Sequence, residues 1–232
     1  QMGASAFSAC WPRMPPVCGK DPAEVAEALR TLNRIYEGRC FDATYMLGDI
    51  HKARSESAEL FGTENVAVYG EITPFSIVSM LKSANAEPGQ HFYDLGSGTG
   101  KVVVLAKLLG LDATGVEFIE ERWVTSCKAR ERLQAEIGNC DGVRFLHSNA
   151  LDVDFSDANI LFSSNIMWPP ALVEGVSAVA RRMQPGSVVV GNKPMLGLGF
   201  ELVTELNLIS SWDQEAKYCL QVVTGEGAST LK

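Results

Sequence analysis

The clearest chemical signal in the chain is the segment from Phe92 to Lys101, FYDLGSGTGK. An apolar run ends at Asp94, three glycines follow at alternate positions, and the apolar run Val102–Ala106 comes directly after Lys101. Glycines in this arrangement let the backbone approach a ligand closely, and a helix that begins behind them presents free N–H groups and a partial positive charge. A strand, a glycine turn and a helix in that order are typical of the place where α/β proteins hold a nucleoside.

The spacing of these glycines separates two classes of cofactor. A dinucleotide-binding turn reads G-x-G-x-x-G, whereas Gly96, Gly98 and Gly100 read G-x-G-x-G, with Asp94 two places before the first glycine. That form resembles motif I of the class I S-adenosylmethionine (SAM) methyltransferases, in which the turn holds a methionine carboxylate and amine. The turn alone leaves an NAD site or a purely structural turn open, so a second signal is needed.

Glu117 is that second signal. It lies 117 − 94 = 23 residues after Asp94, at the end of a predicted strand over residues 113–117. An acidic side chain at this position can accept hydrogen bonds from both ribose hydroxyls of a nucleoside. A surface glutamate after a strand is the structural alternative, and the coincidence of position favours the cofactor site.

The elements that must position these residues alternate between strands and helices along the chain. Their order predicts an α/β fold with a Rossmann-like, doubly wound and mostly parallel sheet, which carries an antiparallel strand near the C-terminus. We also predict an N-terminal arm and helical region over residues 1–65, followed by a SAM-binding domain over residues 66–232. Asp21, Pro22 and Glu24 have the pattern of a helix start, with a capping box and a proline in the first turn. The predicted strands are 92–94, 113–117, 143–146, 159–164, 187–190, 200–208 and 217–223, and the predicted helices are 22–36, 49–61, 75–81, 101–109, 120–137 and one from 170.

Composition limits the functions that need considering. The chain has 232 residues and a formal net charge of −8, which argues against DNA binding through a basic surface of its own and fits a cationic partner such as a basic protein. Its six cysteines and three histidines are scattered without the spacing of metal ligands, so a metal-free site and a reducing compartment are expected. No apolar run reaches the length of a membrane span, and Met2–Cys10 lacks the features of a signal peptide.

Further segments of the predicted fold can border a bound nucleoside. Asn149 and Ala150 follow the third strand, where a polar residue contacts the adenine amine and an apolar one lies against the ring. Residues 165–170 follow the fourth strand, at the carboxyl end of the sheet where ligands of open α/β folds sit. Tyr69-Gly70-Glu71 lies in a loop just before the helix that starts near Pro74, and such a loop can reach over the cofactor; an ordinary turn is the alternative.

Several separate stretches, taken in order, resemble one family. They resemble the catalytic core of the disruptor-of-telomeric-silencing proteins (Dot-one type), which are histone H3 lysine N-methyltransferases without a SET domain. The resemblance covers residues 66–223, and the loop before the first helix, Asn165 and the Lys-Pro pair make it specific. The stretches are Val68–Glu71, Asp94–Gly100, Gly115–Glu117, Ile160–Asn165, Asn192–Met195 and Ser211–Trp212 with Tyr218.

This resemblance implies a function and a set of roles. SAM would donate a methyl group to a lysine on the globular core of histone H3 in nucleosomes, by direct displacement without metal, in the nucleus, leaving S-adenosylhomocysteine. Tyr69, Asn165 and Tyr218 would be the catalytic residues, with Met167 and Trp212 in the wall of the lysine channel. The cofactor-binding residues would be Glu71, Thr73, Asp94, Gly96, Ser97, Gly98, Gly100, Lys101, Glu117, Asn149, Ala150 and Asn165.

The chain departs from the family pattern at some of these positions. Asn149 stands where the family usually has aspartate, Ala150 where it has an aromatic residue, and Lys101 where it has an amide-type residue. Larger members hold nucleosomal DNA with a basic segment beyond the core; this sequence shows no such segment, so no strong DNA-binding patch is expected. Three alternatives stay open: methylation of a non-histone protein lysine or a small amine, a SAM-fold binding module without catalysis, and an NAD-dependent oxidoreductase.

Overall fold

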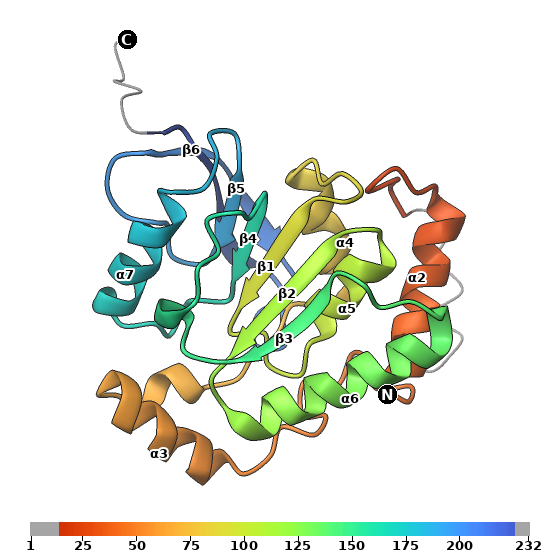
Figure 1. Ribbon diagram of the computed structural model, residues 1–232, viewed down its shortest axis with the longest axis horizontal. Helices are drawn as coiled ribbons and strands as arrows, with labels where there is room; N and C mark the ends of the chain where they lie inside the picture. The colour runs from red at the N-terminus through yellow and green to blue at the C-terminus, as the bar shows by residue number, and fades with distance from the viewer. Residues whose placement is uncertain (1–13, 226–232) are drawn as a thin grey trace.

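A computed structural model describes residues 14–225 of the chain. Seven strands form one sheet in the order β3-β2-β1-β4-β5-β7-β6, as Figure 1 shows. The strands β1 to β5 run parallel, and β7 lies antiparallel between β5 and β6. The predicted doubly wound, mostly parallel sheet with an antiparallel C-terminal part is confirmed. The strands are β1 (His91–Leu95), β2 (Asp112–Glu117), β3 (Val143–His147), β4 (Ile160–Ser163), β5 (Val188–Gly191), β6 (Phe200–Leu208) and β7 (Ala216–Val223).

Helices cover both faces of the sheet. Along β1 and β4, Phe92 and Phe162 belong to a hydrophobic cluster with α4, α5 and α6, and the alternate residues Tyr93 and Leu161 belong to a second cluster with α7. Successive side chains of a strand point to opposite faces, so the two clusters lie on opposite sides of the sheet. The helices are α2 (Pro22–Ile35), α3 (Ile50–Phe61), α4 (Pro74–Ser83), α5 (Lys101–Leu108), α6 (Glu120–Ile137) and α7 (Pro170–Ala180), with the 3-10 helices η2 (Glu64–Ala67) and η3 (Ala150–Asp152).

Local sequence determines where the helices begin. The side chain of Asp21 accepts hydrogen bonds from the N–H groups of Ala23 and Glu24, at 2.8 and 3.0 Å, and the Glu24 carboxylate accepts one from the N–H of Asp21 at 2.9 Å. The predicted capping box is therefore confirmed. Thr73 caps α4 in the same manner, by accepting the N–H of Ser76 at 3.3 Å. The 3-10 helices η2 and η3 are too short to carry a hydrophobic period, and the sequence did not predict them.

Strand register brings the ends of three strands to one edge of the sheet. Asp94 in β1 pairs with Gly115 in β2 and with Phe162 in β4. Two residues after these partners come Glu117 and Ser164. The carboxyl end of β1 is thus flanked by the ends of its two parallel neighbours, which is where open α/β folds bind ligands.

The N-terminal helices pack onto the glycine turn. The Tyr36 hydroxyl donates to the carbonyl oxygen of Thr99 at 2.8 Å, and Nζ of Lys101 donates to the carbonyl oxygen of Asp42 at 2.7 Å. Side chains of α2 share one hydrophobic cluster with those of α5 and the sheet. The proposed division near residue 66 therefore separates segments with a common core. Residues 1–13 of the predicted arm, with Cys10, lie outside the described part of the chain, as do residues 226–232.

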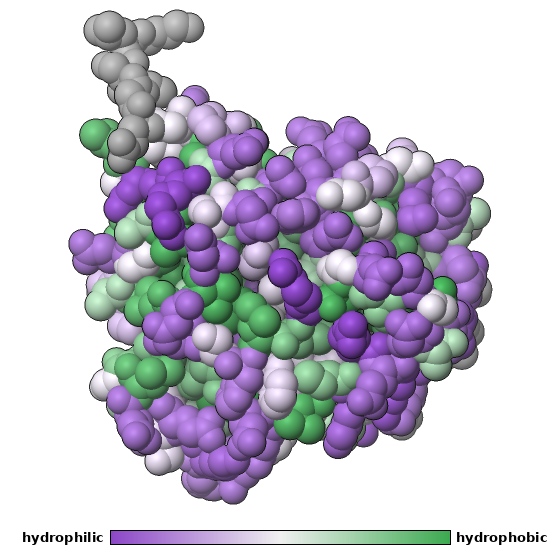
Figure 2. Space-filling model, in the orientation of Figure 1, coloured by the Kyte–Doolittle hydropathy of each residue, from purple (hydrophilic) through white to green (hydrophobic). Residues whose placement is uncertain are grey.

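The surface is mainly hydrophilic, with apolar areas between. On the face drawn in Figure 2, apolar residues gather left of centre and toward the lower edge. Within residues 14–225, no helix combines the length and apolar character needed to cross a membrane.

Candidate active site

The glycine turn has the backbone conformation that its sequence demands. Gly96, Gly98 and Gly100 have φ angles of 82°, 54° and 87°, a region that residues with a side chain rarely adopt. A Cβ atom on Gly98 would lie 2.4 Å from the ring of Tyr69. The helix α5 then begins at Lys101 without a side-chain cap. The turn therefore offers close backbone approach and free helix N–H groups, as predicted.

Asp94, the residue before the last of β1, has a buried carboxylate without a hydrogen-bond partner among the described residues. Its side chain is 2% exposed, and no N–H or O–H group among the described residues donates a hydrogen bond to it. Burial, followed by the nearby charge of Glu117, raises the pKa of Asp94 well above its usual range. A buried charge with no partner is costly, so this position suits a cation or a hydrogen-bond donor that residues 14–225 do not supply.

Glu117 stands at the end of β2, as predicted, and is buried beside the turn. Its Oε2 accepts the N–H of Gly98 at 2.7 Å, and its Oε1 accepts the N–H of Ile119 at 2.9 Å. Each carboxylate oxygen can accept a further hydrogen bond. The carboxylate is thus fixed in orientation by the backbone and retains two acceptor positions, which suits the two hydroxyls of a ribose.

The loop before α4 folds onto the turn through an acid, a phenol and a lysine. The Tyr69 hydroxyl donates to Oε2 of Glu71 at 2.8 Å, and Nζ of Lys101 lies 2.5 Å from Oε1 of Glu71. Burial raises the pKa of Glu71, and the charge of Lys101 opposes that shift. Tyr69, Glu71 and Lys101 therefore come together as predicted. Thr73 does not join them, because its hydroxyl caps α4 and lines neither cavity of the site.

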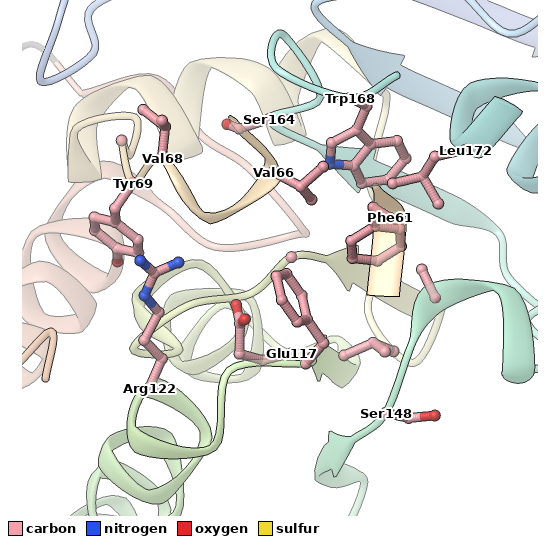
Figure 3. A pocket seen from close by; sticks show the side chains of 15 residues that line it. Phe61, Val66, Val68, Tyr69, Glu117, Arg122, Ser148, Ser164, Trp168 and Leu172 are labelled. Atoms are coloured by element: carbon pink, nitrogen blue, oxygen red, sulfur yellow. The ribbon is translucent and has the colours of Figure 1, made fainter. Parts of the chain in front are cut away.

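Two neighbouring cavities meet at Val68, Tyr69, Gly70 and Ser164. The first, of about 570 Å³ including its open mouth, is drawn in Figure 3. It extends past Glu117 to an apolar wall. Besides the shared residues, the apolar side chains that line this cavity are Phe61, Val66, Val116, Phe118, Ala150, Trp168 and Leu172. Arg122 and Ser148 line it as well. The second cavity is lined by Ile166, Met167 and Trp212 in addition to the shared residues.

The residues after β4 lie differently from the prediction. Asn165 is fully buried, and its side-chain amide forms two hydrogen bonds with the backbone of Lys193, at 2.7 and 3.0 Å. Its neighbour Ser164 lines both cavities instead. Tyr218 is also fully buried and touches the site through Ser164, with 2.9 Å between the two hydroxyl oxygens. Ser164, one position before Asn165, is the side chain that lines the cavities, and the role of Asn165 beside the acceptor lysine stays a prediction.

The two residues expected at the adenine take separate places. Ala150 lines the first cavity, whereas the Asn149 side chain caps η3 by accepting the N–H of Leu151 at 3.0 Å. Three aromatic residues that the sequence did not assign to the site, Phe61, Phe118 and Trp168, line the same cavity. Phe118 follows Glu117 directly, so its position after the acidic residue was the available signal. Phe61 belongs to α3, and only the tertiary fold brings it here.

Comparison with known proteins identifies the family. The model of the family described as "Histone methylation protein DOT1" matches residues 54–221. This chain belongs to that family. A curated DOT1-like relative from Aspergillus fumigatus, named "Histone-lysine N-methyltransferase, H3 lysine-79 specific", is 30% identical over 151 residues, which are 61% of this chain and 30% of the relative. The match thus spans about a third of the length of the curated relatives.

Solved structures share the fold of this DOT1 family member. An RNA methyltransferase from Salinibacter ruber, in complex with S-adenosyl-L-homocysteine, aligns with a TM-score of 0.52 and 22% identity, covering 67% of this chain and 95% of that one. TrmN from Thermus thermophilus aligns with a TM-score of 0.54 and 19% identity, covering 72% and 53%. The sheet is therefore that of the class I methyltransferases. In the described part of the chain, no group of three or more His, Cys, Asp or Glu side chains could hold a metal ion.

Proposed function

We propose that this chain is the SAM-dependent catalytic core of a histone lysine N-methyltransferase, which acts on a lysine of the globular part of histone H3 in nucleosomes. The buried, unpartnered carboxylate of Asp94 beside the glycine turn carries the cofactor half of the proposal. The family description and the name of the Aspergillus relative support the substrate half.

The residues present fit SAM at each of its parts. Asp94 would accept hydrogen bonds from the methionine ammonium, whose charge relieves the cost of its burial. Glu117 would accept the ribose hydroxyls. Phe118 and Ala150 would lie against the adenine, within the apolar wall of the first cavity. The pair formed by Glu71 and Lys101 borders the methionine end, in a recess that Asp94 also lines.

The second cavity is the proposed path of the acceptor lysine. Its walls are apolar at Val68, Ile166 and Met167, and Trp212 stands 40% exposed at its side. An apolar channel disfavours an ammonium and so favours the neutral amine that the reaction needs. A lysine has a pKa near 10.4 in water, and its deprotonation at pH 7 costs about 4 to 5 kcal/mol. The channel lowers part of that cost.

Where the two cavities meet, the side chains orient the amine. SAM, when bound, supplies a methyl group activated by its sulfonium. The Ser164 hydroxyl would hold the amine nitrogen in line, as one part of an alignment of amine, methyl group and sulfur that contributes about 7 to 11 kcal/mol as a whole. Burial raises the pKa of Tyr218 to about 12, so its hydroxyl stays protonated at neutral pH and serves Ser164 as a hydrogen-bond partner rather than as a base. Tyr69 would close the same junction. Asn165 would hold the loop after β4 in place through its two hydrogen bonds with the backbone of Lys193.

The partner and the compartment follow from the substrate. A chain of net charge −8 has an attraction for basic histone surfaces and no general attraction for DNA. We expect it to act on chromatin in the nucleus, with contacts to the nucleosome made through histone protein.

The test is methyl transfer from radiolabelled SAM to recombinant nucleosomes, free histone H3 and nucleosomes in which lysine-79 of H3 is replaced by arginine. The expected result is label on H3 of intact nucleosomes, lost with the arginine substitution. Label that persists on the substituted nucleosomes would move the acceptor to another lysine. SAM binding without any label on H3 would reject the histone proposal and leave the cofactor proposal standing.

A non-histone protein lysine or a small amine is the second candidate for the methyl acceptor. The second cavity suits a long amine, and its lining residues do not distinguish a histone lysine from another amine. Mass spectrometry of a cell extract incubated with the chain and labelled SAM would reveal such an acceptor. Stronger labelling of an extract component than of nucleosomes would favour it.

A further inference from the structure

Arg122 is a buried arginine with most of its donors unused. It stands in the first turn of α6 and is 4% exposed. Its Nη2 donates to the carbonyl oxygen of Ala67 at 2.7 Å, and its Nε is buried with no hydrogen-bond partner. No carboxylate forms an ion pair with it within residues 14–225. A guanidinium has five N–H donors, so burial of this side chain is compensated only in part by the protein.

Arg122 stands beside the nucleoside part of the site. Arg122 lines the first cavity together with Glu117. Its guanidinium carbon lies 4.9 Å from the centroid of the Tyr69 ring, and Figure 3 shows it beneath that ring, with Glu117 projecting into the same cavity. It does not line the recess that holds Asp94, Glu71 and Lys101. The methionine end of the site is therefore not its target.

We propose that Arg122 is a cofactor-binding residue that donates hydrogen bonds to the ribose diol, on the side opposite Glu117. This inference rests on the proposed function, in which Glu117 accepts the ribose hydroxyls. Each hydroxyl has one hydrogen to donate and two lone pairs to accept with. Glu117 accepts the hydrogen bonds that the hydroxyls donate, and Arg122 donates hydrogen bonds to their lone pairs. A cation beside a sulfonium or an ammonium is repelled, whereas a neutral diol is the part of SAM that gains from one.

A purely structural role is the competing explanation. Through Ala67 and Tyr69, Arg122 ties η2 and the loop after it to α6. This latch accounts for one hydrogen of Nη2 and for the face of the guanidinium, and it leaves Nη1 without an acceptor among the described residues. The two explanations differ in what they require of the ligand, because only direct recognition depends on the ribose hydroxyls.

The experiment measures binding of S-adenosylhomocysteine and of its 2′-deoxy and 3′-deoxy analogues to the full chain by isothermal titration calorimetry. The variants are Arg122→Met and Arg122→Lys. Arg130→Met is the matched control, since Arg130 lies on the same helix and donates Nε to the carbonyl oxygen of Val143 at 3.0 Å, away from the cavities. Methionine keeps most of the stem and removes a buried charge, so the fold is expected to persist.

We expect Arg122→Met to weaken binding of S-adenosylhomocysteine by about 10- to 100-fold, as for loss of a hydrogen bond to a charged group. Arg122→Lys should lie between, and Arg130→Met should match the unmodified chain. For at least one deoxy analogue the effect of Arg122→Met should shrink to about three-fold or less, because that ligand lacks the hydroxyl concerned.

Equal losses for the parent ligand and both analogues would overturn the inference and leave Arg122 as a latch. Unchanged binding in Arg122→Met would overturn it outright, with the proposed function untouched. If the unmodified chain binds no S-adenosylhomocysteine, the cofactor proposal fails first and this inference fails with it.

Discussion

The site joins two regions that the chain builds in different ways. Around the glycine turn, backbone groups fix the important side chains, as in the two N–H groups that hold Glu117. After β4, side chains hold one another, as Ser164 does with Tyr218, or hold a distant backbone, as Asn165 does with Lys193. Backbone-built sites demand particular residues at fixed spacing. Sites built from side-chain pairs allow substitution, provided that both partners change together.

This contrast predicts where the two regions tolerate change. The cofactor region should lose binding when a single group is altered, since the backbone cannot adapt. The acceptor region should keep cofactor binding and lose turnover, since its residues line the second cavity.

Glu117→Gln should have the largest effect. The amide retains the volume and can still accept one N–H from Gly98 or Ile119, but it loses the charge that strengthens both ribose hydrogen bonds. Each such bond contributes about 1.5 to 3 kcal/mol, so affinity for S-adenosylhomocysteine should fall by about 100-fold or more in a calorimetric titration. Glu120→Gln is the control, because Glu120 is exposed and, among residues 14–225, forms an ion pair only with Lys52. Affinity within about three-fold of the unmodified chain would remove Glu117 from the ribose site.

The cofactor region was also the more predictable from sequence. Asp94, the glycines and Glu117 lie where their spacing placed them, because turn conformation and strand ends are local properties. The doubly wound, mostly parallel sheet followed from the alternation of strands and helices. Most strand and helix bounds agree to within two residues.

Two kinds of information were missing from the sequence. The partner of Asn165 is the backbone of Lys193, 28 residues away, and no local pattern reveals it. Phe61 lines the first cavity although it belongs to α3, which lies before the domain boundary predicted near residue 66. Arg122 was missed for a different reason: an arginine in a helix is ordinarily exposed, and only the fold shows that this one is buried.

Ser164→Ala and Asn165→Ala separate the structural from the sequence-based assignment of the acceptor region. Ser164→Ala should lower kcat by about 10-fold, as for one lost hydrogen bond of about 1.4 kcal/mol, with affinity for S-adenosylhomocysteine unchanged. Asn165→Ala should lower the melting temperature, because Lys193 loses both backbone hydrogen bonds to the buried amide. Tyr218→Phe removes only the partner of Ser164 and should have a smaller effect on kcat. Full turnover in Ser164→Ala, together with lost turnover in a stable Asn165→Ala protein, would favour the sequence-based assignment of Asn165 to the lysine channel.

Among these substitutions, Asp94→Asn should have the smallest effect. It should stabilise the ligand-free protein and so raise its melting temperature. An acid whose pKa is raised by folding holds its proton more tightly in the fold than in the unfolded chain. Its contribution to stability therefore falls as pH rises from the unfolded pKa of about 3.9 toward the folded value. An asparagine carries no such penalty, so the variant should melt higher at neutral pH, by a few degrees for about 1 to 2 kcal/mol in a chain of this size.

The same substitution connects stability to binding. The gain in melting temperature should shrink toward zero below about pH 4, where the carboxylate is protonated in both states. Affinity for SAM should fall instead, since the ammonium loses its charged acceptor. Melting curves between pH 4 and pH 8, with and without SAM, measure both effects. A lower melting temperature at neutral pH would mean that Asp94 has a stabilising partner within the protein, and the argument that its carboxylate awaits a cation would then fail.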